Sequence, residues 1–502
     1  MKKTIIFFLS AASLFMVSCS DFLTESSQDE IRPNKASDYK ELIAGEVYQD
    51  NNYSSYHTWL DAMTDDVEDF IGSKTKPTIL NPDNRGSGYG YFTWQQSPEN
   101  QLEGVLNSDA AWAGYYHQIL VANMILNDID NVDGTETEKN LIKAESHMIR
   151  AFAYFMLVNL YGEPYDPEIL PNAMGVPVND LVGAQNKKFE RESAADIYAL
   201  ITEDCKTAVE LFEKDNYTTI YRWNKNAAKV FLSRVCLFTH DWDGVIKYAG
   251  EAIAEKPSLW NMEDKQNSDS STSYFFSKGN PEILFSFGYY YSPYWTSGSA
   301  ACYQASASLR AEYTTGDLRL NNTTGEYIRQ LGSTGLLGAG KRYCPRKSYD
   351  SSDTSVHGKA IRNTEAYLNR AEAYAHKSGK ESEALADLNN IRRNRIKAAS
   401  YSELAGLSGN ELLNAVKSER RRELCFEGFR WFDLRRWDRP RIVHSFAPSM
   451  AAKNDKLYFV LEKDDVAYTL PVPKEVILQD SDLENIKRPE RQGLETNPDA
   501  GN

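Results

Sequence analysis

The sequence predicts a mainly α-helical fold, in which a tetratricopeptide-like scaffold of stacked helix pairs carries a large, irregular, loop-rich lobe. Apolar residues recur at helical spacing in separated blocks, mainly within 112–257 and 363–437. Several blocks repeat the small-residue spacing of a tetratricopeptide helix pair. Between them, 48–97 and 259–353 are rich in Gly, Ser, Asn, Asp, Tyr and Trp. Because stacked helix pairs bury a continuous core, we expect the helices to form the scaffold and these two segments the lobe.

The N-terminus has the pattern of an export signal. Lys2 and Lys3 precede an apolar stretch, 4–17, which is shorter than the roughly 20 residues that a membrane-spanning helix needs. Ser18 and Cys19 follow, and this ending resembles a bacterial lipobox, whose cysteine is acylated. An ordinary secretory signal with an incidental cysteine is the alternative. The predicted segments are a lipoprotein signal peptide at 1–18, a lipidated tether at 19–36 and a single body at 37–502.

Three helices are predicted in the first half of the body. The first, 112–130, places Ile119 and Ala122 on one face, and the second, 138–161, continues this helical spacing. The third helix begins at Ser193, with an acidic residue three positions later as in a capping box, and runs to 212.

Two further blocks read as helix pairs. The block 224–255 is broken near 239–242, and its second half has the spacing of the second helix in a tetratricopeptide repeat. The block 364–395 has the same layout around a Ser-Gly-Lys turn at 378–380. Within the loop-rich segments only short strands are expected, such as 282–287.

The composition restricts the classes of function. A formal net charge of −15 argues against a nucleic-acid partner, which requires an excess of Lys and Arg. Apart from Cys19, five cysteines remain without short spacing, and Cys205 and Cys236 lie inside helical patterns, so we expect buried thiols rather than a disulfide framework.

The strongest candidate for a ligand site is the aromatic run 288–295, which follows a predicted strand. Aromatic rings can pack against the C–H faces of sugars, and nearby polar groups can bind their hydroxyls. Some rings of this run are instead expected to face inward, because neighbouring residues of an extended chain alternate. The candidate ligand-binding residues here are Tyr290, Tyr291, Tyr294, Trp295 and Tyr303, with Tyr294 and Trp295 preferred.

A second candidate lies within 53–94. Acidic residues at 65–69 stand beside Trp59, but their spacing is not that of a calcium loop, so a solvated helix end is favoured over a metal site. Trp94 and Trp112 are expected in the core. The candidate ligand-binding residues of this segment are Asp66, Asn81, Tyr89 and Tyr91.

Motifs for catalysis are not found. The sequence has no H-E-x-x-H, G-x-S-x-G or P-loop pattern, and its seven histidines are scattered without metal-ligand spacing. We therefore expect a protein without catalytic residues, cofactor or metal. A glycosidase with paired carboxylates remains the enzymatic alternative, because acidic residues are abundant.

The stretch 418–438 alternates arginines, carboxylates and aromatic residues, which predicts a buried, salt-bridged corner between helices in which Arg430 and Arg435 pair with carboxylates. It resembles the signature of the RagB/SusD family of nutrient-uptake lipoproteins, E-R-x-x-E-L-x-F-E-G-x-R-W-x-D-L-x-R-W. Segments at 123–126, 144–162, 362–373 and 470–475 resemble further motifs of this family. The residues that match the signature are Glu419, Arg420, Glu423, Leu424, Phe426, Glu427, Gly428, Arg430, Trp431, Asp433, Leu434, Arg436 and Trp437.

The resemblance implies a scaffold of about four tetratricopeptide-like helix pairs, held together by these motifs. It also implies a surface lipoprotein of the outer membrane that captures nutrient oligomers and passes them to a SusC-like TonB-dependent transporter. The aromatic loops favour an oligosaccharide as the nutrient. Peptide or glycoprotein binding within the same family, a surface glycosidase and a purely structural scaffold are the alternatives.

Overall fold

Helices occupy most of the chain between residues 111 and 255 and between 363 and 436. The computed structural model describes residues 33–48, 56, 59–70, 88–99, 109–183, 188–268, 275–277, 279–287, 303–321, 325–333, 340–347, 359–447, 456–480, 483 and 485–499. The helices are α2 (Ala36–Glu46), α4 (Ala111–Asp128), α5 (Glu136–Tyr161), α6 (Ala194–Lys214), α7 (Lys225–Phe238), α8 (Trp242–Glu255), α9 (Met262–Ser268), α10 (Ala307–Ala311), α11 (Asn363–Ala375), α12 (Glu381–Arg393), α13 (Gly409–Leu424), α14 (Arg430–Arg436) and α15 (Lys474–Gln479).

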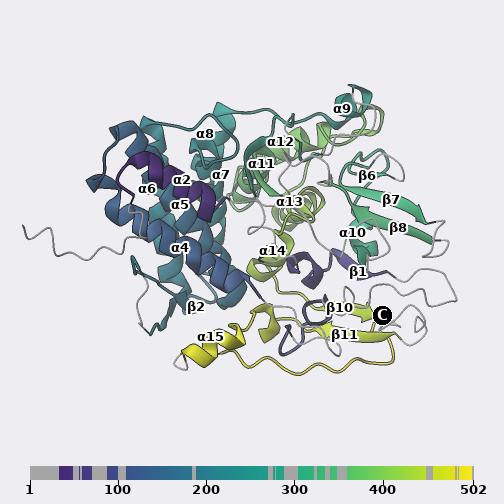
Figure 1. Ribbon diagram of the computed structural model, residues 1–502. Coiled ribbons are helices and arrows are strands. Elements are labelled where there is room, and N and C mark those ends of the chain that lie inside the picture. Colours follow the sequence, from purple (N-terminus) through teal and green to yellow (C-terminus); the bar gives the residue numbers. More distant parts are fainter. Residues whose placement is uncertain are drawn as a thin grey trace, which may run out of the picture.

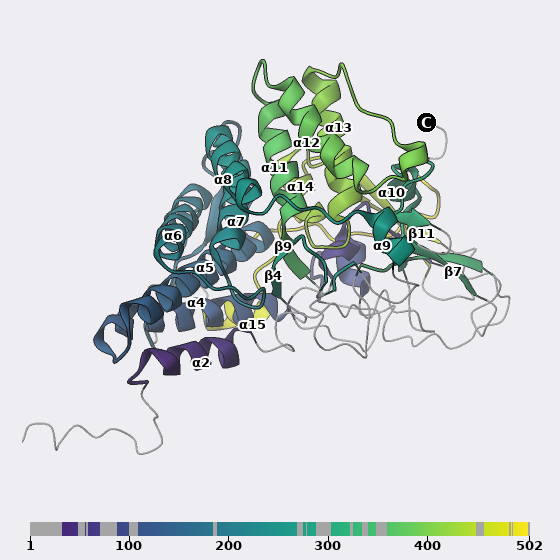
Figure 2. The same ribbon diagram turned by 90° about the horizontal axis from the view of Figure 1, so that it is seen from above.

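The helices pack in an order that confirms the predicted helical-repeat scaffold. Each helix from α4 to α8 lies against the next one, and α8 then packs on α11, which comes about one hundred residues later in the chain. Helix α11 in turn contacts α12 and α13 (Figure 2). The ring of Phe231 on α7 meets Phe155 of α5 edge to face and packs on Phe152 of α5 at a tilted angle, so the core is continuous between these helices.

The predicted helix limits agree closely with the structure. Ser193 caps α6 by accepting a hydrogen bond from the backbone N–H of Asp196 at 3.1 Å. The pair predicted at 224–255 is divided at 239–241, and Cys205 and Cys236 are buried free thiols in the helical core, as expected. The helical periodicity was therefore sufficient to locate the scaffold.

Short strands form the other part of the molecule. They pair as β1–β5, β2–β3, β4–β9 and β10–β11, all antiparallel, and as a three-stranded sheet of order β6–β7–β8. Strand β4 confirms the strand predicted at 282–287, whereas the β7–β8 hairpin was not predicted. The strands are β1 (Val67–Asp69), β2 (Met174–Pro177), β3 (Arg191–Ser193), β4 (Ile283–Phe287), β5 (Tyr303–Ala305), β6 (Leu320–Asn321), β7 (Ile328–Ser333), β8 (Gly340–Pro345), β9 (Lys359–Arg362), β10 (Ile442–Phe446) and β11 (Leu457–Leu461).

Strands β1, β6–β8, β10 and β11 lie on the side of the molecule opposite α4–α6, and α14 lies between the two (Figure 1). The β2–β3 pair instead packs against α5 and α6 on the helical side. Four short 3-10 helices complete the described structure: η2 (Leu60–Met63), η3 (Ile129–Asn131), η4 (Ala398–Ser400) and η6 (Val466–Tyr468). The helical scaffold therefore supports one flank of the strand-rich lobe, and the signature stretch occupies the junction.

Candidate functional site

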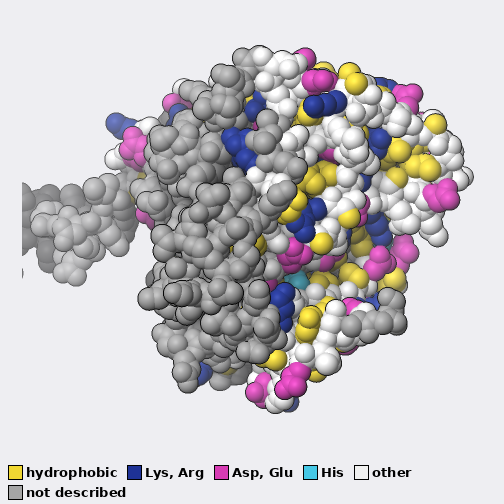
Figure 3. Space-filling view, turned by 90° about the vertical axis from the view of Figure 1, so that its right-hand side faces the viewer, with side chains coloured by type: hydrophobic (Ala, Val, Ile, Leu, Met, Phe, Trp, Pro, Cys, Tyr) yellow, Lys and Arg dark blue, Asp and Glu magenta, His cyan; other side chains and the backbone are white. Residues whose placement is uncertain are grey.

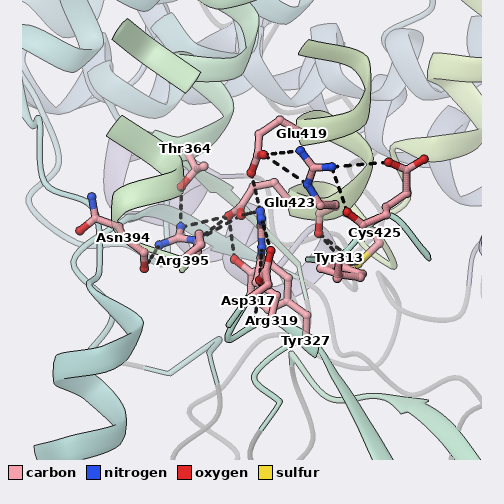
Figure 4. A network of polar contacts seen from close by, with 12 residues as sticks. Tyr313, Asp317, Arg319, Tyr327, Thr364, Asn394, Arg395, Glu419, Glu423 and Cys425 are labelled. Carbon is pink, nitrogen blue, oxygen red and sulfur yellow. Dashed lines mark hydrogen bonds and ion pairs between the residues drawn. The ribbon is translucent and has the colours of Figure 1, made fainter. Parts of the chain in front are cut away.

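A buried ionic network joins the signature helix α13 to the lobe. Glu423 accepts hydrogen bonds from Arg362 at 2.7 Å, from Arg319 at 2.9 Å and from Arg395 at 3.0 Å. Figure 4 shows its carboxylate between Arg395 and Arg319. The hydroxyl of Tyr327 donates to the same carboxylate at 2.7 Å. These partners come from four separate segments of the chain, so Glu423 fixes α13 against the loops around it.

The arginines keep the carboxylates of this network ionised. Burial alone would raise the pKa of Glu423, but Arg395, Arg362 and Arg319 hold it well below its usual range. The pKa of Glu419 is likewise lowered to about 2, because the effect of Arg319 and Arg422 outweighs burial. Removing one partner of a buried ion pair is costly, because the other charge is left unpaired. The network around Glu423 therefore has a structural role, and we call it the signature clamp.

The turn after α13 brings the second half of the signature into place. Gly428 adopts φ +84°, a left-handed conformation that favours glycine, and a Cβ there would lie 3.3 Å from Leu60. Beyond this turn, Arg430 forms a two-pronged pair with Asp65 at 2.7 and 2.8 Å. Segment 59–66 is therefore attached directly to the signature.

Arg435 differs from the prediction. Among the residues that the structure describes, it pairs with no carboxylate but donates to two backbone carbonyls at the C-terminal end of α5, those of Asn159 and Gly162. The last turn of α5 contains no basic residue of its own, and its carbonyl groups carry partial negative charge. Arg435 thus caps α5 from a distant part of the sequence.

Three of the predicted ligand-binding residues lie in the interior. Asp66, Tyr91 and Tyr303 are each 1% exposed. Asp66 pairs with Arg421 at 2.7 Å, the ring of Tyr91 stacks on Trp59 at 4.2 Å, and the ring of Tyr303 packs on Phe92 at 4.5 Å. This burial favours roles in packing and in the signature clamp for the three residues. Their predicted contact with a ligand stays a prediction.

Tyr89 is half-buried, and its ring packs against Phe446 and Phe459 on the β10–β11 hairpin, with centroids 5.0 and 5.7 Å apart. Trp94 and Trp112 are buried, as predicted. The remaining predicted residues, Tyr290, Tyr291, Tyr294, Trp295, Asn81 and Cys19, lie outside the described residues.

The described part of the lobe contains an open groove of about 740 Å³, which we call the α10 groove. Its walls are α10, the loop 314–321, one residue of β8 and the segment 397–400. The polar residues that line it include Arg310, Thr314, Asn321, Tyr343, Lys397 and Ser400. Sequence reasoning missed this groove, because these segments carry no motif and meet only through the fold.

In the part of the chain that the structure describes, no cluster of three or more His, Cys, Asp or Glu side chains is arranged to hold a metal ion. Within the same residues, no helix is both long enough and apolar enough to span a bilayer.

Comparison with known proteins decides the family. The sequence profile described as the SusD family matches residues 78–490, which is most of the chain and includes the whole signature. The chain belongs to the SusD family. This SusD-family protein is 24% identical over 416 residues to the SusD-like protein P2 of Formosa agariphila, covering 74% of this chain and 79% of that protein. A SusD-like protein of Bacteroides ovatus is also 24% identical, over 66% of each chain.

Solved structures share the SusD fold. A SusD superfamily protein from Bacteroides vulgatus superposes with a TM-score of 0.67 at 17% identity and covers 91% of this chain and all of that one. A SusD-like carbohydrate binding protein from the same species gives a TM-score of 0.65 at 19% identity, with 90% and 98% of the two chains covered. The tetratricopeptide-like scaffold predicted from the sequence is thus the fold of this SusD-family protein.

Proposed function

We propose that this protein is a non-catalytic binding protein of the bacterial cell surface, which captures glycan oligomers and delivers them to a TonB-dependent transporter of the outer membrane. Membership of the SusD family is the observation that carries the proposal. A relative of the same fold is named as a carbohydrate binding protein, which supports a sugar as the ligand.

The aromatic run 288–295 supports the same ligand class. It places Tyr294 and Trp295 directly after Pro293, in a polar stretch where packing in a core does not explain so many rings. Flat aromatic surfaces bind the apolar faces of sugar rings, while neighbouring polar groups bind hydroxyls. We propose that Tyr294 and Trp295 contact the glycan.

Anchoring through Cys19 supports the proposed location. Attachment of more than one acyl chain gives stable membrane association, whereas a single chain binds only marginally. The polar tether 19–36 would then connect the lipid to the body, and a transporter in the same membrane would be within its reach.

Calorimetry of the purified chain against a panel of neutral oligosaccharides and peptides tests the proposal, with chromatography of each mixture for products. We expect binding to at least one oligosaccharide without products. The double variant Tyr294→Ala/Trp295→Ala should weaken that binding by roughly ten- to a hundredfold, because removing a buried aromatic contact costs about 1.5–3 kcal/mol. Tyr248→Ala on α8, a scaffold residue, is the matched control and should leave the affinity unchanged.

The outcomes separate the alternatives. Turnover of an oligosaccharide would contradict the non-catalytic role and favour a glycosidase. Binding of peptides alone would replace the glycan as ligand. Full affinity in the double variant would remove Tyr294 and Trp295 from the site.

A further inference from the structure

The α10 groove has walls that are fixed by the fold. The backbone N–H of Lys397 donates to the carbonyl of Gly316 at 3.0 Å, and the N–H of Leu318 donates to the carbonyl of Arg395 at 2.9 Å. Gly316 adopts φ +87°, and a Cβ at this position would lie 2.4 Å from the Cβ of Ser400. Two walls therefore meet at a close contact that only glycine permits.

The signature clamp also holds the loop 314–321, which forms one wall of the groove, against α13. Asp317 pairs with Arg319 at 2.7 Å, and Arg319 continues to Glu419 on α13 at 2.6 Å. All three of these side chains are buried. The loop 314–321 is consequently attached to α13 through buried ion pairs, so this wall of the groove is held in place by the fold itself.

Two cations and one carboxylate line the α10 groove, although the chain as a whole carries a formal net charge of −15. Arg310 lies over the ring of Tyr343, with its guanidinium carbon 4.0 Å from the ring centroid, and forms an ion pair with Glu68 at 3.2 Å. Lys397 is exposed and forms no ion pair with any residue that the structure describes. The carboxylate in the lining, Asp317, is neutralised by Arg319.

Figure 3 views the side of the molecule on which β7 and β8 lie. Among the described side chains of this face, Lys and Arg lie beside hydrophobic and acidic groups rather than in one uniform basic patch. Such a mixed surface does not suit a polyanion, which requires a continuous row of cations. A small ligand that places one carboxylate against the basic residues of the groove matches the local arrangement better.

We propose that the α10 groove is a second saccharide site and that it takes acidic sugars, whose carboxylate would pair with Lys397 and Arg310. The hydroxyls of Thr314 and Ser400 and the amide of Asn321 supply partners for sugar hydroxyls. The volume of about 740 Å³ falls in the range of small-molecule sites, roughly 300–1,000 Å³. The choice of a sugar rests on the proposed function, whereas the choice of an anion rests on the groove.

The test compares trigalacturonate with the neutral trisaccharide of galactose, by calorimetry on the full chain. We expect Lys397→Gln to weaken trigalacturonate binding about tenfold, because a charge-assisted hydrogen bond is lost, and to leave neutral glycans unaffected. Lys474→Gln on α15 makes the same change of charge at an exposed position outside the groove lining and should have no effect. Because Lys397 is exposed, the variant should unfold at the wild-type temperature.

A second variant separates this inference from the proposed function. Tyr294→Ala/Trp295→Ala should retain trigalacturonate binding while neutral glycan binding weakens by roughly ten- to a hundredfold. If the chain binds neutral glycans but Lys397→Gln does not change its affinity for trigalacturonate, the acidic-sugar site is overturned and glycan capture stands. If trigalacturonate binds through Lys397 and no neutral glycan binds, the acidic-sugar site is supported and the capture of neutral glycans is contradicted. Absence of any glycan binding overturns both.

Discussion

Single buried polar residues connect distant parts of this molecule, and His444 is the clearest case. Its ring lies between Phe92 and Trp94, with centroid distances of 4.1 and 4.3 Å. Its two nitrogens face the carbonyl oxygens of Phe92 and Thr64 at 2.7 and 3.0 Å. Burial lowers the pKa of His444 to about 4, because desolvation of the charged ring outweighs the two carbonyl contacts.

A dependence of stability on pH follows from this lowered pKa. The unfolded chain protonates His444 near its ordinary pKa of 6.5, whereas the folded protein does so only near 4. The contribution of His444 to stability is therefore present above pH 6.5 and is lost as pH falls toward 4. Between pH 7 and pH 5, we expect the unfolding free energy of wild type to fall by about 2 kcal/mol more than that of the variant His444→Asn.

Urea unfolding at the two pH values measures this difference, and contributions of other groups cancel when wild type and variant are compared. Identical pH dependence in the two proteins would show that His444 is not held neutral in the folded state.

Some partners of single residues could not be predicted from the sequence. Tyr91 and Tyr303 lie in polar stretches that resemble ligand loops, yet their rings fill the core between η2, β5 and β10. Nothing in the local sequence distinguishes an aromatic ring that covers a ligand from one that supports a loop from beneath. Arg435 was predicted to find a carboxylate, but the exposed carbonyls at the end of α5 are equally good acceptors, and the sequence does not indicate which helix end lies nearby.

At the scale of elements, the joint between α7 and β4 depends on Asn224. Its side-chain oxygen accepts from the backbone N–H of Ala227 at 3.1 Å and caps α7, while its amide donates to the carbonyl of Leu284 at 2.7 Å. Asn224→Ala should lower the unfolding free energy by about 2–3 kcal/mol, because a cap is lost and a buried carbonyl is left without its donor. Ser193→Ala removes only the cap of α6 and should cost about 1 kcal/mol.

Urea unfolding at neutral pH provides both values. Equal losses in the two variants would mean that the Leu284 carbonyl has found another donor and that Asn224 acts as a cap alone.

Elements differ in how well a sequence predicts them. The helices were located because apolar spacing and capping residues are local signals that repeat over many residues. The β7–β8 hairpin was missed because its strands have weak alternation and a glycine-rich connection, which read equally well as a loop. The α10 groove depends on residues 310, 343 and 397 meeting in space, and no local pattern encodes that meeting.

At the scale of the whole molecule, the proposed surface location depends on Cys19. Cys19→Ser removes the sulfur that would carry the lipid, so we expect the variant to leave the outer-membrane fraction and to appear in soluble fractions. Cell fractionation with immunoblotting measures the distribution, and Cys205→Ser, a buried thiol of the scaffold, is the control. A variant that remains in the membrane fraction would show that another feature attaches the protein.

Segment 59–70 reaches its place only through partners that are far away in the sequence. Asp65 pairs with Arg430, and the carbonyl of Thr64 contacts His444, 380 positions later. Contacts of such large sequence separation slow folding, since a long loop must close before they are formed. Until residue 444 has emerged, the early segment lacks these partners. On the proposed export route, a chain synthesised from its N-terminus would therefore stay incompletely folded up to that point, which would keep it able to pass through a narrow export channel.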